Sequence, residues 1–157
     1  DPEVLVAIGG LAGISAATGL KTATATAMRF IVGTTATTDF TAGSSAQTLT
    51  CQVTWDEQIT VTGNPTIVVA NGNEGTGSGR GPYTLVYTAT GSTANRKRFT
   101  ATPTSVTNDV ITLGGGSQAN IALASGTISD TTVGGTNTAA LLVLTALTAQ
   151  TITVTAS

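Results

Sequence analysis

Histidine is absent from the 157-residue sequence, and cysteine occurs once, at Cys51. Without an imidazole, the chain has no Ser-His or Cys-His nucleophile pair and lacks a common ligand of zinc and iron sites. A lone cysteine cannot form an intramolecular disulfide, and the apolar residues on its side of the predicted strand indicate a small buried side chain. We therefore expect a protein that is not an enzyme and that has no cofactor, no catalytic residue and no bound metal.

Charge is also scarce, because charged residues make up 9% of the sequence, against about a quarter in ordinary globular proteins. Solubility must come from Thr, Ser, Asn and Gln side chains, and such a surface suits close packing against neighbouring proteins. Six basic residues and a net charge of −2 cannot neutralise many phosphates, so we expect no nucleic-acid partner. The one basic cluster, Arg96-Lys97-Arg98, lies in a predicted strand. There Arg96 and Arg98 are expected to face water while Phe99 faces the core, with an anionic site as the alternative.

Long hydrophobic runs are missing as well. No stretch of about 18 consecutive apolar residues occurs, so we expect no membrane span. The most apolar stretch, Val4 to Ala17, follows the acidic Asp1-Pro2-Glu3 and contains several glycines. A signal peptide has Lys or Arg in that flank, so the stretch is not typical of one.

The length of the chain predicts one domain, large enough to bury roughly two thirds of its unfolded surface. We expect an apolar N-terminal arm over residues 1–21 and a single domain over residues 22–157. The arm has apolar side chains without the alternation or caps that would fix it in a core, and its glycines would let it conform to a neighbouring subunit. Its predicted partner-binding residues are Leu5, Ile8, Leu11 and Ile14.

The rest of the sequence alternates apolar and polar residues with the period of a β-strand. In the clearest run, Leu49, Cys51, Val53 and Trp55 share one parity, while Thr and Gln residues occupy the other. Strands are predicted over 47–55, 58–62, 66–70, 83–88, 96–101, 109–113, 120–124, 126–129, 139–147 and 150–155, after a first strand that contains Met28, Phe30 and Val32. Their number and spacing predict an all-β, antiparallel two-sheet sandwich. Its expected core contains Leu49, Val53, Trp55, Ile59, Val61, Leu85 and Tyr87.

Two segments leave their structure more open. Residues 33–46, rich in Gly, Thr and Ser, predict a loop. The run 139–144 could open a short helix, but the β-branched residues that follow favour a strand buried on both faces.

A few patterns could carry chemistry. Gly114–Ala119 fits the dinucleotide fingerprint G-x-G-x-x-A, but no helical stripe follows it, so a wide hairpin loop is the favoured interpretation. Asp56 and Glu57 are the only adjacent carboxylates, and adjacent strand residues point to opposite faces, so they cannot flank one substrate. Glu57, Asp109 and Asp130 lie near predicted strand ends, which leaves a loop-bound calcium ion as an alternative to plain edge or turn residues.

Three segments resemble the bacterial and phage Ig-like repeats that are related to cadherin-like domains: VTWDEQITVTGNPTIVVANG (53–72), GRGPYTLVYTA (79–89) and ALASGTISDTTVGGTNTAAL (122–141). In that family, a strand ending in an acidic residue leads into a VTGxPT strand pair, a Gly-rich hairpin and an aromatic strand. The resemblance covers about residues 47 to 143 and implies an Ig-like β-sandwich.

The resemblance also implies a place of action, since such domains occur on tailed-phage virions and on cell-surface adhesins. Together with the charge-poor surface and the apolar arm, it predicts a structural virion protein, a capsid decoration or cement protein on the virion surface. The expected partners are the major capsid protein or other virion proteins, and further copies of the chain in a homo-oligomer. The alternatives are a host-recognition tail or fibre module, a bacterial adhesin or surface-layer domain at the cell surface, and a glycan-binding module built on Trp55.

Overall fold

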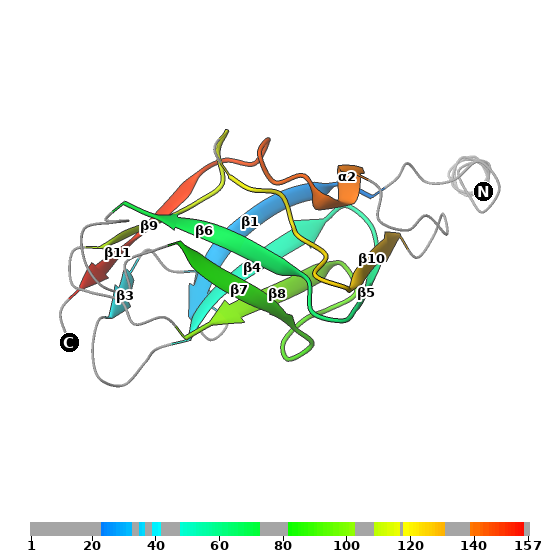
Figure 1. Cartoon of the computed structure of the whole chain (residues 1–157), viewed down its shortest axis with the longest axis horizontal. Coiled ribbons are helices and arrows are strands. Elements are labelled where there is room, and N and C mark those ends of the chain that lie inside the picture. The colour runs from blue at the N-terminus through cyan, green and yellow to red at the C-terminus, as the bar shows by residue number, and fades with distance from the viewer. Residues whose placement is uncertain are drawn as a thin grey trace, which may run out of the picture.

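The computed structural model describes residues 23–32, 35–36, 39–41, 48–72, 82–102, 109–116, 118–130 and 139–155 (Figure 1). These residues form eleven strands and one short helix. In chain order the elements are β1 (Ala25–Val32), β2 (Thr35–Ala36), β3 (Asp39–Thr41), β4 (Leu49–Trp55), β5 (Ile59–Thr62), β6 (Thr66–Asn71), β7 (Tyr83–Thr88), β8 (Arg96–Ala101), β9 (Val110–Leu113), β10 (Thr127–Asp130), α2 (Ala139–Leu142) and β11 (Gln150–Thr155).

Nine of these strands lie in one hydrogen-bonded sheet, in the order β2-β1-β4-β8-β7-β6-β9-β11-β3, and β5 pairs with β10 in a small second sheet. All pairs of named strands are antiparallel except β11 with β3. The predicted all-β, antiparallel class is therefore confirmed. The described strands do not divide into two facing sheets of similar size, as the predicted two-sheet sandwich would require.

Strand β6 explains this difference. Its residues Thr66–Val69 pair with β7, while Ala70 and Asn71 pair with β9, so one strand serves two groups of neighbours. The sheet therefore curls at β6 instead of breaking into two. At the far side of the curl, β1 lies close to β9 and β11, and a Cβ atom on Gly114 would lie 2.8 Å from the terminal methyl of Met28. The sheet is thus nearly closed, like a barrel, around one core.

The alternation read from the sequence defines the side of the sheet that faces this core. Of the seven predicted core residues, five are buried and two, Val61 and Tyr87, are half-buried and pack against the same cluster. Phe99 is fully buried and meets Tyr87 edge to face, with ring centroids 6.0 Å apart. The prediction that Phe99 faces the core and Arg96 faces water is confirmed, whereas Arg98, on the same side as Arg96, is half-buried.

Strand β8 also places Lys97 on the inner side, which the sequence analysis did not predict. Lys97 pairs with Val53 and is 8% exposed, and its Nζ donates a hydrogen bond of 2.8 Å to the carbonyl oxygen of Thr93. Burial lowers the pKa of Lys97. The aliphatic stem therefore packs in the core while the amine reaches the loop between β7 and β8.

Helix α2 lies where the sequence predicted a strand over residues 139–147, and that prediction is wrong. A helix end leaves carbonyl groups without partners inside the helix. Here the carbonyl of Leu141 accepts a hydrogen bond from Trp55 Nε1 at 3.0 Å, and the carbonyl of Leu142 accepts one from the amide of Ile121 at 3.0 Å. Both donors lie far from α2 in the sequence. They satisfy the two carbonyl groups at the end of α2, which stabilises this single helical turn against the core.

Two smaller predictions also differ from the structure. The predicted strand over 120–124 is reduced to a single bridge between Ala122 and Thr66, and the predicted loop over 33–46 contains the short strands β2 and β3. The other predicted strands whose ends were given end within two residues of the observed bounds.

Cys51 provides a direct check of the β4 register. It is a free cysteine, fully buried on the inner side of β4, and burial raises the pKa of its thiol far above the usual range. Because the thiolate is the reactive form, we expect a thiol reagent to modify Cys51 no faster than the domain unfolds. Labelling rates under native and denaturing conditions measure this. Fast native labelling would mean that β4 is shifted by one residue, which would turn Cys51 outward.

Candidate assembly site at the root of the N-terminal arm

The chain enters the described domain at Ala23, where two carboxylates hold the backbone. The amide of Ala23 donates a hydrogen bond of 2.8 Å to Asp130 Oδ2. The amide and hydroxyl of Thr24 donate to the two oxygens of Asp56, at 2.7 and 2.8 Å, and the amide of Asp56 donates back to the Thr24 carbonyl at 3.1 Å. We call these four residues, Ala23, Thr24, Asp56 and Asp130, the arm root.

Asp130 forms the buried side of the arm root. It is the last residue of β10, pairs with Ile59 of β5 and is only 1% exposed. A buried carboxylate is costly unless it accepts hydrogen bonds, and bonds to a charged oxygen are stronger than those between neutral groups. The amide of Ala23, a fully buried residue, provides one of these bonds. The strand end that the sequence identified at Asp130 thus anchors Ala23, the first described residue.

Asp56 forms the exposed side of the arm root. It follows Trp55 directly, at the point where β4 ends, and it binds Thr24 through both carboxylate oxygens. Exposure to water weakens each bond, but contact at three points restricts the direction of the backbone. The start of β1 also lies beside α2, which in turn lies beside β10 (Figure 1). The arm root therefore fixes the position and direction of the chain at Ala23 and Thr24.

The predicted partner-binding residues Leu5, Ile8, Leu11 and Ile14 lie outside the described residues. The structure thus gives the attachment of the arm and not the position of these side chains. Sequence reasoning predicted an arm over residues 1–21 but did not predict the contacts at its root. Its only sequence signal was two carboxylates, Asp56 and Asp130, each at or directly after the end of a predicted strand.

The carboxylates considered for calcium are not brought together. Asp130 belongs to the arm root, whereas Asp109 binds Asn71, and within the described part of the chain no three Cys, Asp or Glu residues could hold a metal ion. Asp56 and Glu57 do not act as a pair either, because Asp56 is engaged by Thr24.

A buried polar cluster lies where β6 ends and β7 begins. Asn71 Nδ2 donates to Tyr83 Oη at 3.2 Å and to Asp109 Oδ2 at 3.3 Å, and Tyr83 Oη lies 3.5 Å from the same carboxylate oxygen. All three residues are buried, so these bonds help to offset the cost of removing their polar groups from water. The sequence analysis missed this cluster, since the only signal was a polar residue at each of two strand ends.

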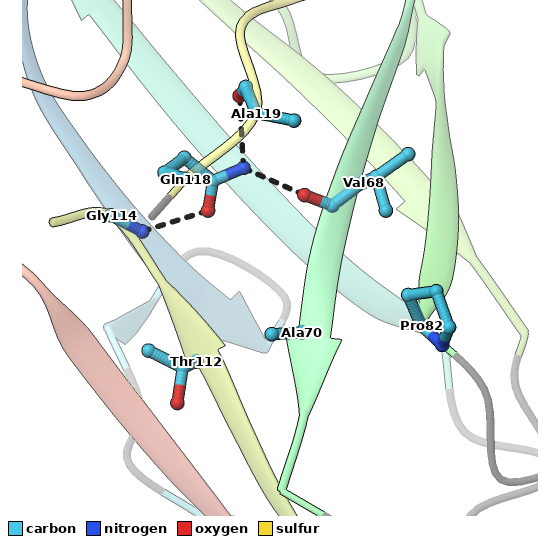
Figure 2. Close-up of a pocket in the computed structure, with 7 residues that line it drawn as sticks. All are labelled: Val68, Ala70, Pro82, Thr112, Gly114, Gln118 and Ala119. Carbon is cyan, nitrogen blue, oxygen red and sulfur yellow. Dashed lines mark hydrogen bonds between the residues drawn. The ribbon is translucent and has the colours of Figure 1, made fainter. Parts of the chain in front are cut away.

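Gln118 joins two strands where they separate (Figure 2). Its Oε1 accepts a hydrogen bond of 2.9 Å from the Gly114 amide, and its Nε2 donates one of 2.6 Å to the Val68 carbonyl. Extending the register of Ala70 with Thr112 would place Val68 opposite Gly114. The carboxamide of Gln118 therefore replaces a missing hydrogen bond of the ladder between β6 and β9.

A small open cavity of about 140 Å³ lies beside this side chain. It is lined by uncharged residues, namely Val68, Ala70, Pro82, Thr112, Gly114, Gln118 and Ala119 (Figure 2). Its residues offer a ligand no charged group and no side chain that can act as an acid or base.

The fingerprint match at Gly114–Ala119 does not form a phosphate cradle. A phosphate site needs free amide groups at a helix N-terminus. Here the amides of Gly114, Gly115 and Gln118 donate to Gln118 Oε1, the Leu147 carbonyl and the Gly115 carbonyl, and no helix follows between residues 118 and 130. The described residues of the segment form a loop, as the sequence analysis favoured.

Trp55 is 1% exposed, and its indole nitrogen is bound to Leu141, so it does not form a surface platform for a sugar. Comparisons of the chain with protein-family models, curated proteins and solved structures find no match. Among the described residues, no helix is both long and apolar enough to cross a bilayer.

Proposed function

We propose that this protein is a non-enzymatic structural component of a tailed-phage virion, a capsid decoration or cement protein that docks on the shell. Its partners would be the major capsid protein or other virion proteins, and further copies of the chain. The observation that carries the proposal is the arm root, which joins an apolar arm to a domain that already has its own core.

The arm supports the proposal through the area that it could bury. If a neighbour covers about 600 Å² of apolar arm surface, the gross gain is near 15 kcal/mol at about 25 cal/mol per Å². The cost of ordering the arm and of association offsets much of this. Ala23 and Thr24 add nothing to that cost, because carboxylates already hold them before any partner binds.

The Ig-like relationship is part of the same proposal. The two segments that carry the resemblance most closely contribute β5 and β10, which pair with each other over four residues. The corner at β6 is the kind of strand that connects the two layers of a sandwich, so an Ig-like sandwich whose layers remain joined fits this domain.

Removing residues 1–21 is the decisive experiment. We expect the truncated chain to unfold cooperatively, with a midpoint close to that of the full chain, because the described residues from Ala23 onward form a core cluster with one another. We also expect it to lose self-association and binding to particles. Circular dichroism during denaturation, light scattering after gel filtration, and cosedimentation with particles from the native source measure the three properties.

A control that keeps residues 1–21 separates the effect of the apolar side chains from the effect of the length of the arm. Replacing Leu5, Ile8, Leu11 and Ile14 by serine should abolish assembly as completely as the deletion does. If the truncated chain fails to fold, the arm is a core strand and the proposal is wrong. If it folds and still binds particles, the arm is not the assembly element, and a recognition module of a tail, fibre or adhesin becomes the better explanation.

A further inference from the structure

The outer side of the sheet formed by β1, β4, β8 and β7 gathers three of the six basic residues of the chain. In the strand register, Gln52 of β4 lies between Arg29 of β1 and Arg98 of β8. One step along the sheet, Thr54 lies between Ala27 and Arg96. Side chains alternate between faces, so the three arginines share the side opposite the core.

Among the described residues of these four strands, no acidic residue belongs to this face. The neighbouring positions in the register are Ala27, Ile31, Thr50, Gln52, Thr54, Val86, Thr88 and Thr100. The carboxylates of the arm root and of the cluster at Asp109 hold other groups. Ile31, Thr50 and Gln52 are buried, so this neutral patch is open to water only in part. Arg96 is exposed there, and Arg29 and Arg98 are half-buried.

Arg98 is held in place on this face. Its half-buried side chain runs under the turn between β7 and β8, where a Cβ atom on Gly91 would overlap the guanidinium group. The Nε atom of Arg98 is buried and has no hydrogen-bond partner, which is unusual for a polar atom out of contact with water. Its backbone amide is bound to Ser92 Oγ at 2.9 Å. This cation is therefore preorganised and incompletely satisfied.

The spacing of the arginines follows from sheet geometry. Arg29 and Arg98 are two strands apart, about 10 Å, and Arg96 and Arg98 are two residues apart on one strand, about 7 Å. Carboxylates at alternate positions of an extended segment have the same repeat of about 7 Å. Arginine also binds carboxylates through two parallel hydrogen bonds, which suits it to such a segment.

We propose that Arg29, Arg96 and Arg98 form a docking face for an acidic, extended segment of a partner protein. The face is separate from the arm, and it gives the protein a second contact whose strength depends on salt. Three positive charges on a chain of net charge −2 are too few for a nucleic-acid backbone, which favours a protein partner. The electrostatic contact would set the orientation of docking, while the arm provides apolar area.

The experiment uses the full chain labelled with ¹⁵N and an octaglutamate peptide as the probe. The Nε–Hε signals of the three arginines are followed during titration, at low salt and at high salt. We expect saturable shifts at Arg29, Arg96 and Arg98 that salt suppresses. The triple variant R29Q/R96Q/R98Q should bind at least about tenfold more weakly. R80Q removes one positive charge at a position that belongs to none of these four strands, and it should bind like the parent.

Two further variants complete the experiment. The double variant R29Q/R96Q leaves Arg98 and its turn intact, and it should still weaken binding several-fold if its thermal midpoint is unchanged. The chain that lacks residues 1–21 should bind the peptide normally, so a failure of the arm proposal leaves this one standing. Equal losses in R80Q and the triple variant, an absence of shifts at the three arginines, or tighter binding of octathymidylate or inorganic phosphate would overturn it.

Discussion

Replacing Trp55 by alanine is expected to lower the free energy of unfolding by about 3 to 5 kcal/mol. The side chain is 1% exposed and belongs to the one core cluster, so its removal leaves a cavity that the curled sheet cannot easily close. The substitution also removes the donor that binds the Leu141 carbonyl at 3.0 Å. A buried carbonyl without its donor adds to the loss, and α2 would lose its hydrogen bond to β4.

A phenylalanine at the same position separates the two effects. Trp55→Phe keeps most of the apolar volume and removes the indole N–H, so we expect a loss of about 1 to 2 kcal/mol. Equilibrium denaturation of both variants gives the free energies, provided that the dependence on denaturant is the same in each. A loss below about 1 kcal/mol for alanine would contradict the buried position of Trp55.

The strands of this protein could be predicted because a strict alternation repeats along the chain. Each inner row needs apolar residues two apart, and runs such as Leu49 to Trp55 contain few interruptions. The same pattern defined the core correctly even at Phe99, which stands among three basic residues. The alternation of apolar and polar residues is a property of each strand alone, so it does not depend on which strands pair with each other.

The pairing itself could not be read in this way. Whether strands form two sheets or one curled sheet depends on β6, whose two ends pair with different neighbours. Helix α2 was missed for a similar reason, because its four residues have no helical period and depend on donors from Trp55 and Ile121. In both cases, the curled sheet and the helix α2, long-range hydrogen bonds determine the structure and override local propensity.

The candidate surfaces show the same limit. The apolar arm is visible in the sequence, but its root joins residues 107 positions apart, Ala23 and Asp130. The basic cluster at Arg96 and Arg98 is also visible, yet Arg29 joins it only through the register of β4 between them. Sequence reasoning therefore found segments and clusters that are continuous in the chain, and it missed the contacts between residues far apart in the sequence.

Replacing Gly126 by alanine is expected to destabilise the domain by about 2 to 3 kcal/mol, because the backbone of β5 approaches this residue too closely for a side chain. A Cβ atom there would overlap the Thr62 carbonyl oxygen and would lie 2.9 Å from the Pro65 ring and 3.0 Å from the Leu123 carbonyl. Two of these three groups are backbone carbonyls: that of Thr62 lies in the β5–β10 pairing, and that of Leu123 accepts a hydrogen bond from the Gly126 amide. Gly63 lies on the other side of the contact, with a φ of +66°.

Gly116 provides the matched control for this substitution. It is exposed, a Cβ atom there would meet nothing within 4 Å, and its φ lies outside the positive range. Gly116→Ala should therefore change the free energy of unfolding by less than about 0.5 kcal/mol. Equilibrium denaturation of the two variants beside the parent gives the comparison. If Gly126→Ala proves as harmless as the control, β5 and β10 are not packed backbone to backbone. The close approach of the two backbones would then not explain why glycine occupies positions 63 and 126.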